Sequence, residues 1–108
     1  MEENDVVRAL SALAQPLRLR LFRTLVVAGP AGRTPATLTA SLAVPATTLS
    51  FHLKELVQAG LLSQQRDGRN LIYRASYDRM NALLAYLTAH CCQGEGCFGV
   101  ANPACATC

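Results

Sequence analysis

Two short amphipathic stretches separated by a three-residue break constrain the fold of this chain most strongly. The first stretch follows Thr34, a typical helix N-cap, and runs from Pro35 to Leu42. The break is Ala-Val-Pro at 43–45. The second stretch runs from about Pro45 to Gln58, with apolar side chains at helical spacing, and Gly60 ends it. Two helices of this size joined by a tight turn predict a helix-turn-helix.

The flanking segments extend this pattern on both sides. Helical spacing predicts a helix over 4–14 and a second one from Pro16 to the Gly-Pro-Ala-Gly stop at 29–32. After the recognition-type helix, residues 66–69 (Arg-Asp-Gly-Arg) predict the turn of a hairpin, and 77–90 predict a last helix. The expected fold is therefore mainly α (α+β): a winged helix-turn-helix of five helices with a two-stranded β-wing.

The two terminal helices carry more apolar side chains than one small core can absorb. An apolar surface of this kind is typical of an interface between copies of a chain. We therefore expect a homodimer through the terminal helices, with an interface built from Val6, Val7, Leu10, Leu13, Leu83, Leu84, Tyr86 and Leu87.

The chain of 108 residues has the length of one domain, which we place at 1–92. Residues 93–108 are rich in Gly, Ala, Cys and Pro without periodic apolar positions, and this composition predicts a flexible Cys-rich tail. The sequence shows neither a signal peptide nor an apolar run of the roughly 20 residues that a membrane helix needs. We expect a cytoplasmic protein without a membrane partner, whose thiols stay reduced.

Positive charge is concentrated in the middle of the chain. Residues 16–79 carry nine basic side chains against three acidic ones, and nine of the ten bases in the whole chain are Arg. Arginine suits bidentate contact with phosphate. The charge alone is equally consistent with a nucleic-acid partner and with a solvated basic surface.

Three motifs together resemble the ArsR/SmtB family of bacterial transcription factors. Residues 14–22 (AQPLRLRLF) resemble the opening of the family's second helix. Residues 47–62 (TTLSFHLKELVQAGLL) are similar to its recognition helix, and RDGR at 66–69 followed by Ile72-Tyr73 is similar to its wing. The resemblance covers roughly 6–90, and the combination of motifs is specific. Phe51 departs from the pattern, because members often carry a second His there; it either alters base preference or simply packs.

The resemblance implies a repressor that binds double-stranded operator DNA as a homodimer. A recognition helix places its N-terminal side chains against base edges in the major groove. Lys54 could contact a phosphate instead of a base. Arg66 and Arg69 of the wing should contact the flanking DNA backbone or the minor groove. Two alternatives without DNA contact remain open. Thr48 could cap the helix, and His52 could be a surface residue. The DNA-binding residues expected are Thr47, Thr48, Ser50, His52, Lys54, Arg66 and Arg69.

All five cysteines lie in the last eighteen residues. Some family members carry an arsenic site in the helix before the recognition helix, but 35–42 contain no cysteine. Others bind zinc through Asp and His pairs in the final helix, where this chain has Asp78 but Met80 in place of the next His. Still others place a Cys-Cys pair at the end of that helix and a third Cys beyond it. Cys91, Cys92 and Cys97 match this last pattern.

The resemblance thus implies release from DNA by As(III), with Sb(III) as a second thiophilic inducer, and no organic cofactor. Soft thiolates select such ions over hard ones. Cys105 and Cys108 are auxiliary candidates, and their spacing also resembles half of a structural zinc site. A zinc or divalent-metal response, a dithiol redox switch and an incidental Cys-rich tail remain as alternatives.

An enzyme is not expected from these cysteines. An arsenate reductase would need an anion-binding loop such as Cys-x5-Arg, but no Arg follows Arg79 in this chain. A thiol metallochaperone is the stronger rival to a repressor. It would need the cysteines but neither the recognition-type helix nor the wing.

Overall fold

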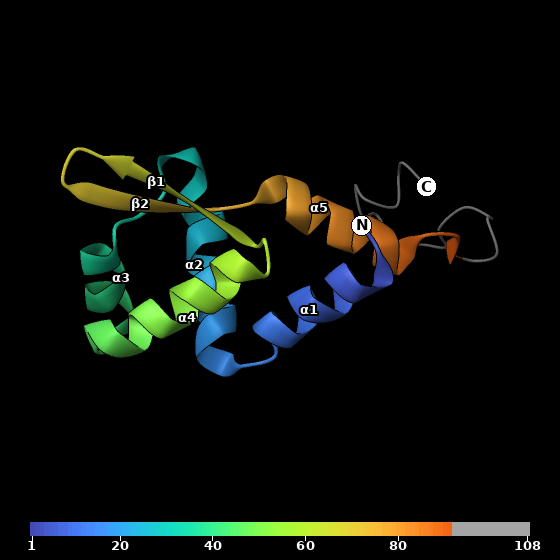
Figure 1. Ribbon diagram of the computed structural model, residues 1–108, viewed down its shortest axis with the longest axis horizontal. Coiled ribbons are helices and arrows are strands. Elements are labelled where there is room, and N and C mark those ends of the chain that lie inside the picture. The colour runs from blue at the N-terminus through green and yellow to red at the C-terminus, as the bar shows by residue number, and fades with distance from the viewer. Residues whose placement is uncertain (92–108) are drawn as a thin grey trace.

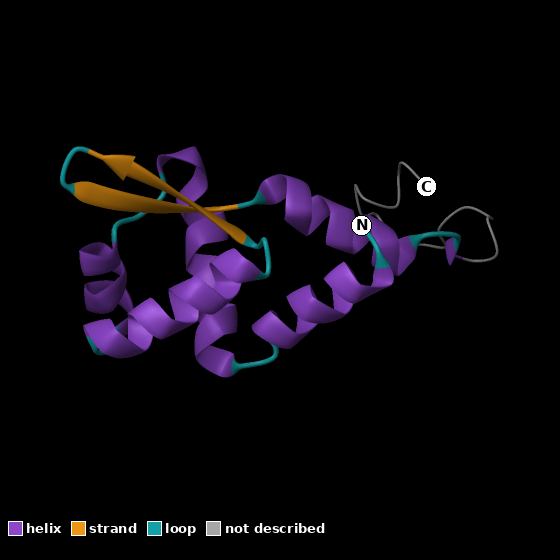
Figure 2. Cartoon of the chain, viewed as in Figure 1, coloured by secondary structure: helices purple, strands orange, loops and turns teal. Residues whose placement is uncertain are grey.

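The computed structural model describes residues 1–91, and within them five helices and one hairpin follow each other along the chain (Figures 1 and 2). A 3₁₀ turn at Gly29–Ala31 separates the second helix from the third. This order confirms the predicted winged helix-turn-helix. The elements are α1 (Glu3–Leu13), α2 (Pro16–Ala28), α3 (Pro35–Leu42), α4 (Ala46–Gln58), β1 (Leu62–Asp67), β2 (Asn70–Ala75) and α5 (Tyr77–Thr88).

Side-chain caps fix where three of the helices begin. The Gln15 side chain accepts a hydrogen bond from the backbone N–H of Arg18 at the start of α2, at 2.8 Å. Thr34 caps α3 as its sequence position predicts, and Ser76 caps α5. Each cap satisfies an N–H that has no partner inside its helix. Pro45 is the N-cap residue of α4 and not its first helical residue, one position earlier than a proline usually takes.

The turn between α3 and α4 depends on one residue in the left-handed region. Ala43 has φ 54° and ψ 48°, and its N–H is donated to the carbonyl of Thr39. Glycine is the usual residue at this position because it has no Cβ. The turn ends after one further residue, and α4 then packs against α3 as a helix-turn-helix requires.

The core lies between the helices and the base of the hairpin, and α5 contributes Leu83 to it. The apolar faces of the helices meet here, since their leucines recur at helical spacing. Fully removing a leucine side chain from water stabilises the fold by about 1.5–3 kcal/mol. The fully buried set consists of Leu21, Leu25, Leu38, Leu49, Leu53, Leu56 and Leu61.

The wing is a two-stranded antiparallel sheet whose register runs from Leu62 opposite Ala75 to Asp67 opposite Asn70. Only residues 68 and 69 lie between the strands, so the turn is one residue further along than RDGR predicts. Gly68 has φ 64°. A glycine with positive φ at the first of two loop residues is typical of a type II′ turn, which follows the twist of the strands.

A short bridge ties the wing to the segment before α3. The backbone N–H and carbonyl of Arg33 exchange hydrogen bonds with those of Tyr73, both at 2.9 Å. Gly32 makes this approach possible. A Cβ built on it would lie 2.6 Å from the carbonyl oxygen of Tyr73. Arg74 adds a second tie, because its Nε donates to the carbonyl of Pro30 and its guanidinium also donates to Gln65.

The final helix is shorter than expected. It ends at Thr88, not at His90, and the extended C-cap residue Ala89 interrupts the helical spacing before Cys91. His90 then takes a left-handed conformation with φ 57°. Cys91 therefore does not continue the apolar stripe of α5, and the helix predicted over 77–90 is two residues too long at its C-terminal end. The boundary of the first domain at residue 92 and the predicted tail at 93–108 lie outside the described residues.

The two terminal helices lie together at one end of the molecule (Figure 1). Val6 and Leu83 are buried between α1, α5 and the core, and Leu13 is partly buried. The other members of the predicted interface set remain at least 41 % exposed in the single chain, although all are apolar or aromatic. They are Val7, Leu10, Leu84, Tyr86 and Leu87.

Candidate nucleic-acid interface

One face of α4 is exposed along its whole length. Thr47, Ser50, Lys54 and Gln58 lie on this face, spaced three or four residues apart. The opposite face packs into the core through the buried Leu49, Leu53 and Leu56. The exposed face is called the reading face below. It carries hydroxyls and an ammonium group, which can donate hydrogen bonds to base edges and phosphates.

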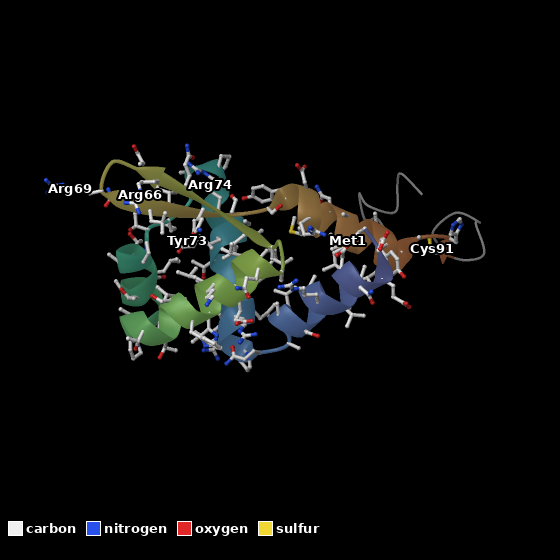
Figure 3. All side chains as sticks on the ribbon, in the orientation of Figure 1. Met1, Arg66, Arg69, Tyr73, Arg74 and Cys91 are labelled. Atoms are coloured by element: carbon white, nitrogen blue, oxygen red, sulfur yellow. The ribbon has the colours of Figure 1, made fainter. Side chains whose placement is uncertain are left out.

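The wing supplies a second polar surface. Every residue from Ser63 to Asn70 is exposed. Arg66 and Arg69 lie at the tip of the hairpin (Figure 3). The tip and the N-terminal end of α4 lie toward the same end of the molecule, away from the end where α1 begins (Figure 1). Two guanidinium groups here suit contact with the phosphates that flank a groove.

The structure corrects the placement of His52, which the sequence predicted near DNA. His52 is only 8 % exposed, because it lies on the same face of α4 as Leu49 and Leu56. Its Nδ1 accepts a hydrogen bond from Nε of Arg18 at 3.0 Å. An accepting Nδ1 carries no proton, so the neutral ring holds its proton on Nε2. His52 therefore joins α4 to α2 and does not contribute to the reading face.

Burial and the neighbouring charge agree with this neutral ring. Desolvation lowers the pKa of His52 below its ordinary value of 6.5, and the nearby Arg18 lowers it further. Glu55 acts in the opposite direction. At neutral pH the ring thus accepts the arginine hydrogen bond without repelling the guanidinium. In the wing, burial raises the pKa of the Tyr73 hydroxyl, which keeps this residue neutral as well.

The remaining sequence-predicted residues of α4 divide into two groups. Thr47, Ser50 and Lys54 are exposed, whereas Thr48 is half-buried at the edge of the reading face. Pro45, not Thr48, occupies the N-cap position of α4, so the alternative capping role of Thr48 does not apply to the start of this helix.

Sequence reasoning left the role of Phe51 open and missed Arg18. Phe51 is 55 % exposed and lies between Ser50 and Lys54 on the reading face. Arg18 reaches it from α2, with its guanidinium carbon 5.5 Å from the centroid of the ring. The helical spacing already contained the signal for Phe51, since it lies four residues after Thr47. The spacing could not reveal Arg18, because that contact joins positions 18 and 51.

The cysteine site falls almost entirely outside the described residues. Cys92, Cys97, Cys105 and Cys108 are not described, and Cys91 is half-buried beyond the end of α5 (Figure 3). Within residues 1–91, no group of three or more His, Cys, Asp or Glu side chains is placed to hold a metal ion. In the same part of the chain, no helix is long and apolar enough to cross a membrane.

Comparison with known proteins agrees with this geometry. Residues 13–65 match a family profile described as a helix-turn-helix domain. The chain is 30% identical over 78 residues to the HTH-type transcriptional regulator YgaV of Escherichia coli (strain K12), which covers 72% of this chain and 77% of that protein. The chain belongs to the ArsR/SmtB family of winged helix-turn-helix transcriptional regulators.

Solved structures of family members have the same fold. An ArsR-like transcriptional regulator from Rhodococcus sp. RHA1 superposes with a TM-score of 0.70 at 25% identity, over 78% of this chain and 76% of that one. A structure described as a "possible transcriptional regulator for arsenical resistance" gives 0.65 at 30% identity, over 75% and 81%. The homodimeric DNA-binding domain of Mb0332 from Mycobacterium bovis gives 0.65 at 25% identity, over 85% of each chain.

These ArsR/SmtB relatives are transcriptional regulators and not enzymes. The protein is accordingly a transcriptional regulator, and its helix-turn-helix is the DNA-binding element of its family. The reading face of α4 and the tip of the wing beside it are both exposed.

Proposed function

We propose that the protein is a transcriptional repressor that binds operator DNA as a homodimer and is released when As(III) or Sb(III) binds its C-terminal thiolates. The observation that carries the DNA-binding part is the exposed polar face of α4 beside a wing with Arg66 and Arg69 at its tip. The observation that carries the inducer part is the confinement of all five cysteines to the last eighteen residues.

Support for DNA binding comes from the division of α4 into two faces. Its buried face fixes the helix against the core, so the hydroxyls of Thr47 and Ser50 and the ammonium group of Lys54 are presented on a rigid element. A helix held in this way is already ordered, so it loses little conformational entropy when it enters the major groove. Arg66 and Arg69 would then position the duplex through its backbone.

Support for the homodimer comes from the apolar side chains that α1 and α5 leave exposed. Val7 and Leu87, for example, are 56 % and 54 % exposed. Covering such side chains between two copies would remove apolar surface from water. The neighbour Mb0332 is described as homodimeric. A two-fold dimer would bind two half-sites separated by about one helical turn of DNA, roughly 34–36 Å.

Support for the inducer comes from thiol chemistry and from the end of α5. Neighbouring cysteines on an intact helix diverge by about 100° around its axis, which separates their sulfur atoms. Here α5 already ends at Thr88, and His90 has left the helical conformation before Cys91 is reached. Cys91 therefore lies beyond α5, so binding of an ion at its sulfur atom would not require α5 to unwind. Ion binding at this end would act on the α1 and α5 pair.

The experiment that tests both parts is fluorescence anisotropy of the reduced protein on DNA from its own upstream promoter. Arsenite and zinc are titrated separately into the complex. We expect saturable binding and release by micromolar arsenite but not by zinc. Binding that ignores arsenite would favour a zinc or redox response, and arsenite binding without DNA binding would favour a metallochaperone.

Replacement of Cys92 isolates the thiolate site. Cys92→Ser should leave the Kd for DNA unchanged and abolish the arsenite response, since a hydroxyl is a much poorer ligand for a thiophilic ion. Cys108→Ser is the matched control, and we expect it to weaken the response less because Cys108 is only an auxiliary candidate. Release of Cys92→Ser by arsenite at the wild-type concentration would contradict the assignment.

A further inference from the structure

Phe51 is a large apolar side chain in the centre of an otherwise polar face. It is 55 % exposed in the single chain, although Thr47, Ser50 and Lys54 surround it on the reading face with polar groups. A phenyl ring has no hydrogen-bonding atom. In the major groove, its favourable partner is therefore the C5-methyl group of thymine, which is the apolar feature of a base-pair edge.

Two neighbours hold the Phe51 ring in place. The Arg18 guanidinium carbon lies 5.5 Å from its centroid. The ring of His52 lies edge-on to it, with centroids 5.5 Å apart and an interplanar angle of 66°. Arg18 is itself fixed, because its Nε donates to His52 and its backbone N–H donates to Gln15. The aromatic side chain is thus ordered before DNA arrives, which lowers the entropy lost on binding.

We propose that Phe51 is a specificity-determining residue that contacts the 5-methyl group of a thymine in each operator half-site, and that Arg18 is the positioning residue for its ring. This inference rests on the proposed function, because it assumes that the reading face enters the major groove. It goes beyond that function by naming the chemical feature of the operator that Phe51 selects.

The size of the effect follows from the burial of one methyl group. A buried methyl or methylene contributes about 0.8 kcal/mol, which corresponds to a factor of about four in Kd. A symmetric dimer makes the contact twice. Removing both methyl groups should therefore weaken binding by about 15-fold, if the two half-sites contribute independently.

The test begins with the selection of duplexes from a random library by the full-length reduced protein. Each symmetry-related pair of thymines in the selected operator is then replaced by deoxyuridine, which lacks only the methyl group. Kd is measured by fluorescence anisotropy at one salt concentration. For the wild-type protein, we expect one thymine pair whose replacement raises Kd about 15-fold. For Phe51→Ala, we expect equal Kd values for the thymine and deoxyuridine duplexes at that pair.

Matched variants separate methyl recognition from general loss of affinity. Arg66→Ala should bind all duplexes more weakly but keep the wild-type ratio between thymine and deoxyuridine. Arg18→Met keeps an unbranched stem but loses the guanidinium, and we expect this ratio to fall. Arg20→Met makes the same change at an exposed position of the same helix and should preserve the ratio. Thermal melts show whether each variant is folded, and Phe51→Gln is the second variant if Phe51→Ala is not.

Three results would overturn the inference in distinguishable ways. If no thymine pair in the selected operator responds to deoxyuridine, or if Phe51→Ala keeps the wild-type ratio, Phe51 does not contact a methyl group, although the proposed repressor remains. If Arg18→Met and Arg20→Met have the same wild-type ratio, Arg18 does not position the ring. If the wild-type protein selects no sequence from the library, the proposed function fails and this inference fails with it.

Discussion

Substitution of Gly32 by Ala tests how strongly the wing depends on its bridge to the segment before α3. Gly32 has φ 68° and ψ −167°, and a Cβ there would lie 2.6 Å from the carbonyl oxygen of Tyr73. That oxygen belongs to the backbone, so it cannot move aside as the end of a flexible side chain can. Gly32→Ala should therefore separate Arg33 from Tyr73 and break their two hydrogen bonds.

Gly29 supplies a matched control for this substitution. Its backbone angles, φ 76° and ψ −161°, are almost those of Gly32, but a Cβ there would meet nothing within 4 Å. Placing alanine in this region costs about 1–3 kcal/mol at either position. The two lost hydrogen bonds add about 0.5–1.5 kcal/mol each at position 32 only. Gly32→Ala should thus lower the free energy of unfolding by about 1–3 kcal/mol more than Gly29→Ala.

Urea denaturation followed by far-ultraviolet circular dichroism measures this difference. Both variants must be compared at one protein concentration, because dimerisation would make the apparent stability depend on it. In thermal melts, the same difference corresponds to roughly 4–8 °C per kcal/mol for a domain of this size. Equal free energies of unfolding for the two variants would refute the reasoning, since a Cβ meets the wing (Tyr73, Ile72 and Arg74) at position 32 and nothing at position 29.

Two further expectations follow from the site. Arg69→Ala should weaken DNA binding similarly on all sequences and make the dependence of log K on log[salt] shallower by about 1 for each lost phosphate contact; an unchanged slope would exclude this contact. Because the folded-state pKa of His52 lies below 6.5, its contribution to the free energy of unfolding is complete above pH 6.5 and is lost as the pH falls through the lowered pKa. His52→Asn keeps an acceptor near the Nδ1 position but cannot titrate, so denaturation curves between pH 8 and pH 5 should show a smaller loss of stability than the wild type; identical pH profiles would contradict the assignment.

The helical spacing and the capping residues predicted most of the fold. Thr34 and Gly60 mark helix ends where the structure has them, because a cap depends on neighbouring residues alone. The hairpin followed from Asp67-Gly68 in the same way. The bridge from Arg33 to Tyr73 was not predictable, since it joins segments forty residues apart through backbone atoms.

The site was less predictable than the fold, because it depends on which side of α4 faces the core. A histidine shortly after Thr47 and Ser50 suggested a base contact. His52 nevertheless follows Leu49 by three residues and precedes Leu56 by four, and this spacing puts it on the buried face. Phe51 is apolar and nevertheless exposed. Residue type alone favours an exposed position for the histidine and a buried one for the phenylalanine. Their positions around the helix place them the other way round.

The wing arginines and Cys91 lie at opposite ends of the molecule (Figure 3). This separation has a practical consequence for engineering. A ligand-binding sequence attached after α5 would leave Arg66, Arg69 and the exposed side of α4 unaltered. The junction at Ala89, the C-cap residue where the backbone leaves the helical conformation, offers a natural splice point. Chimeras joined there would show whether a ligand-binding segment and this DNA-binding domain can be combined freely in a biosensor.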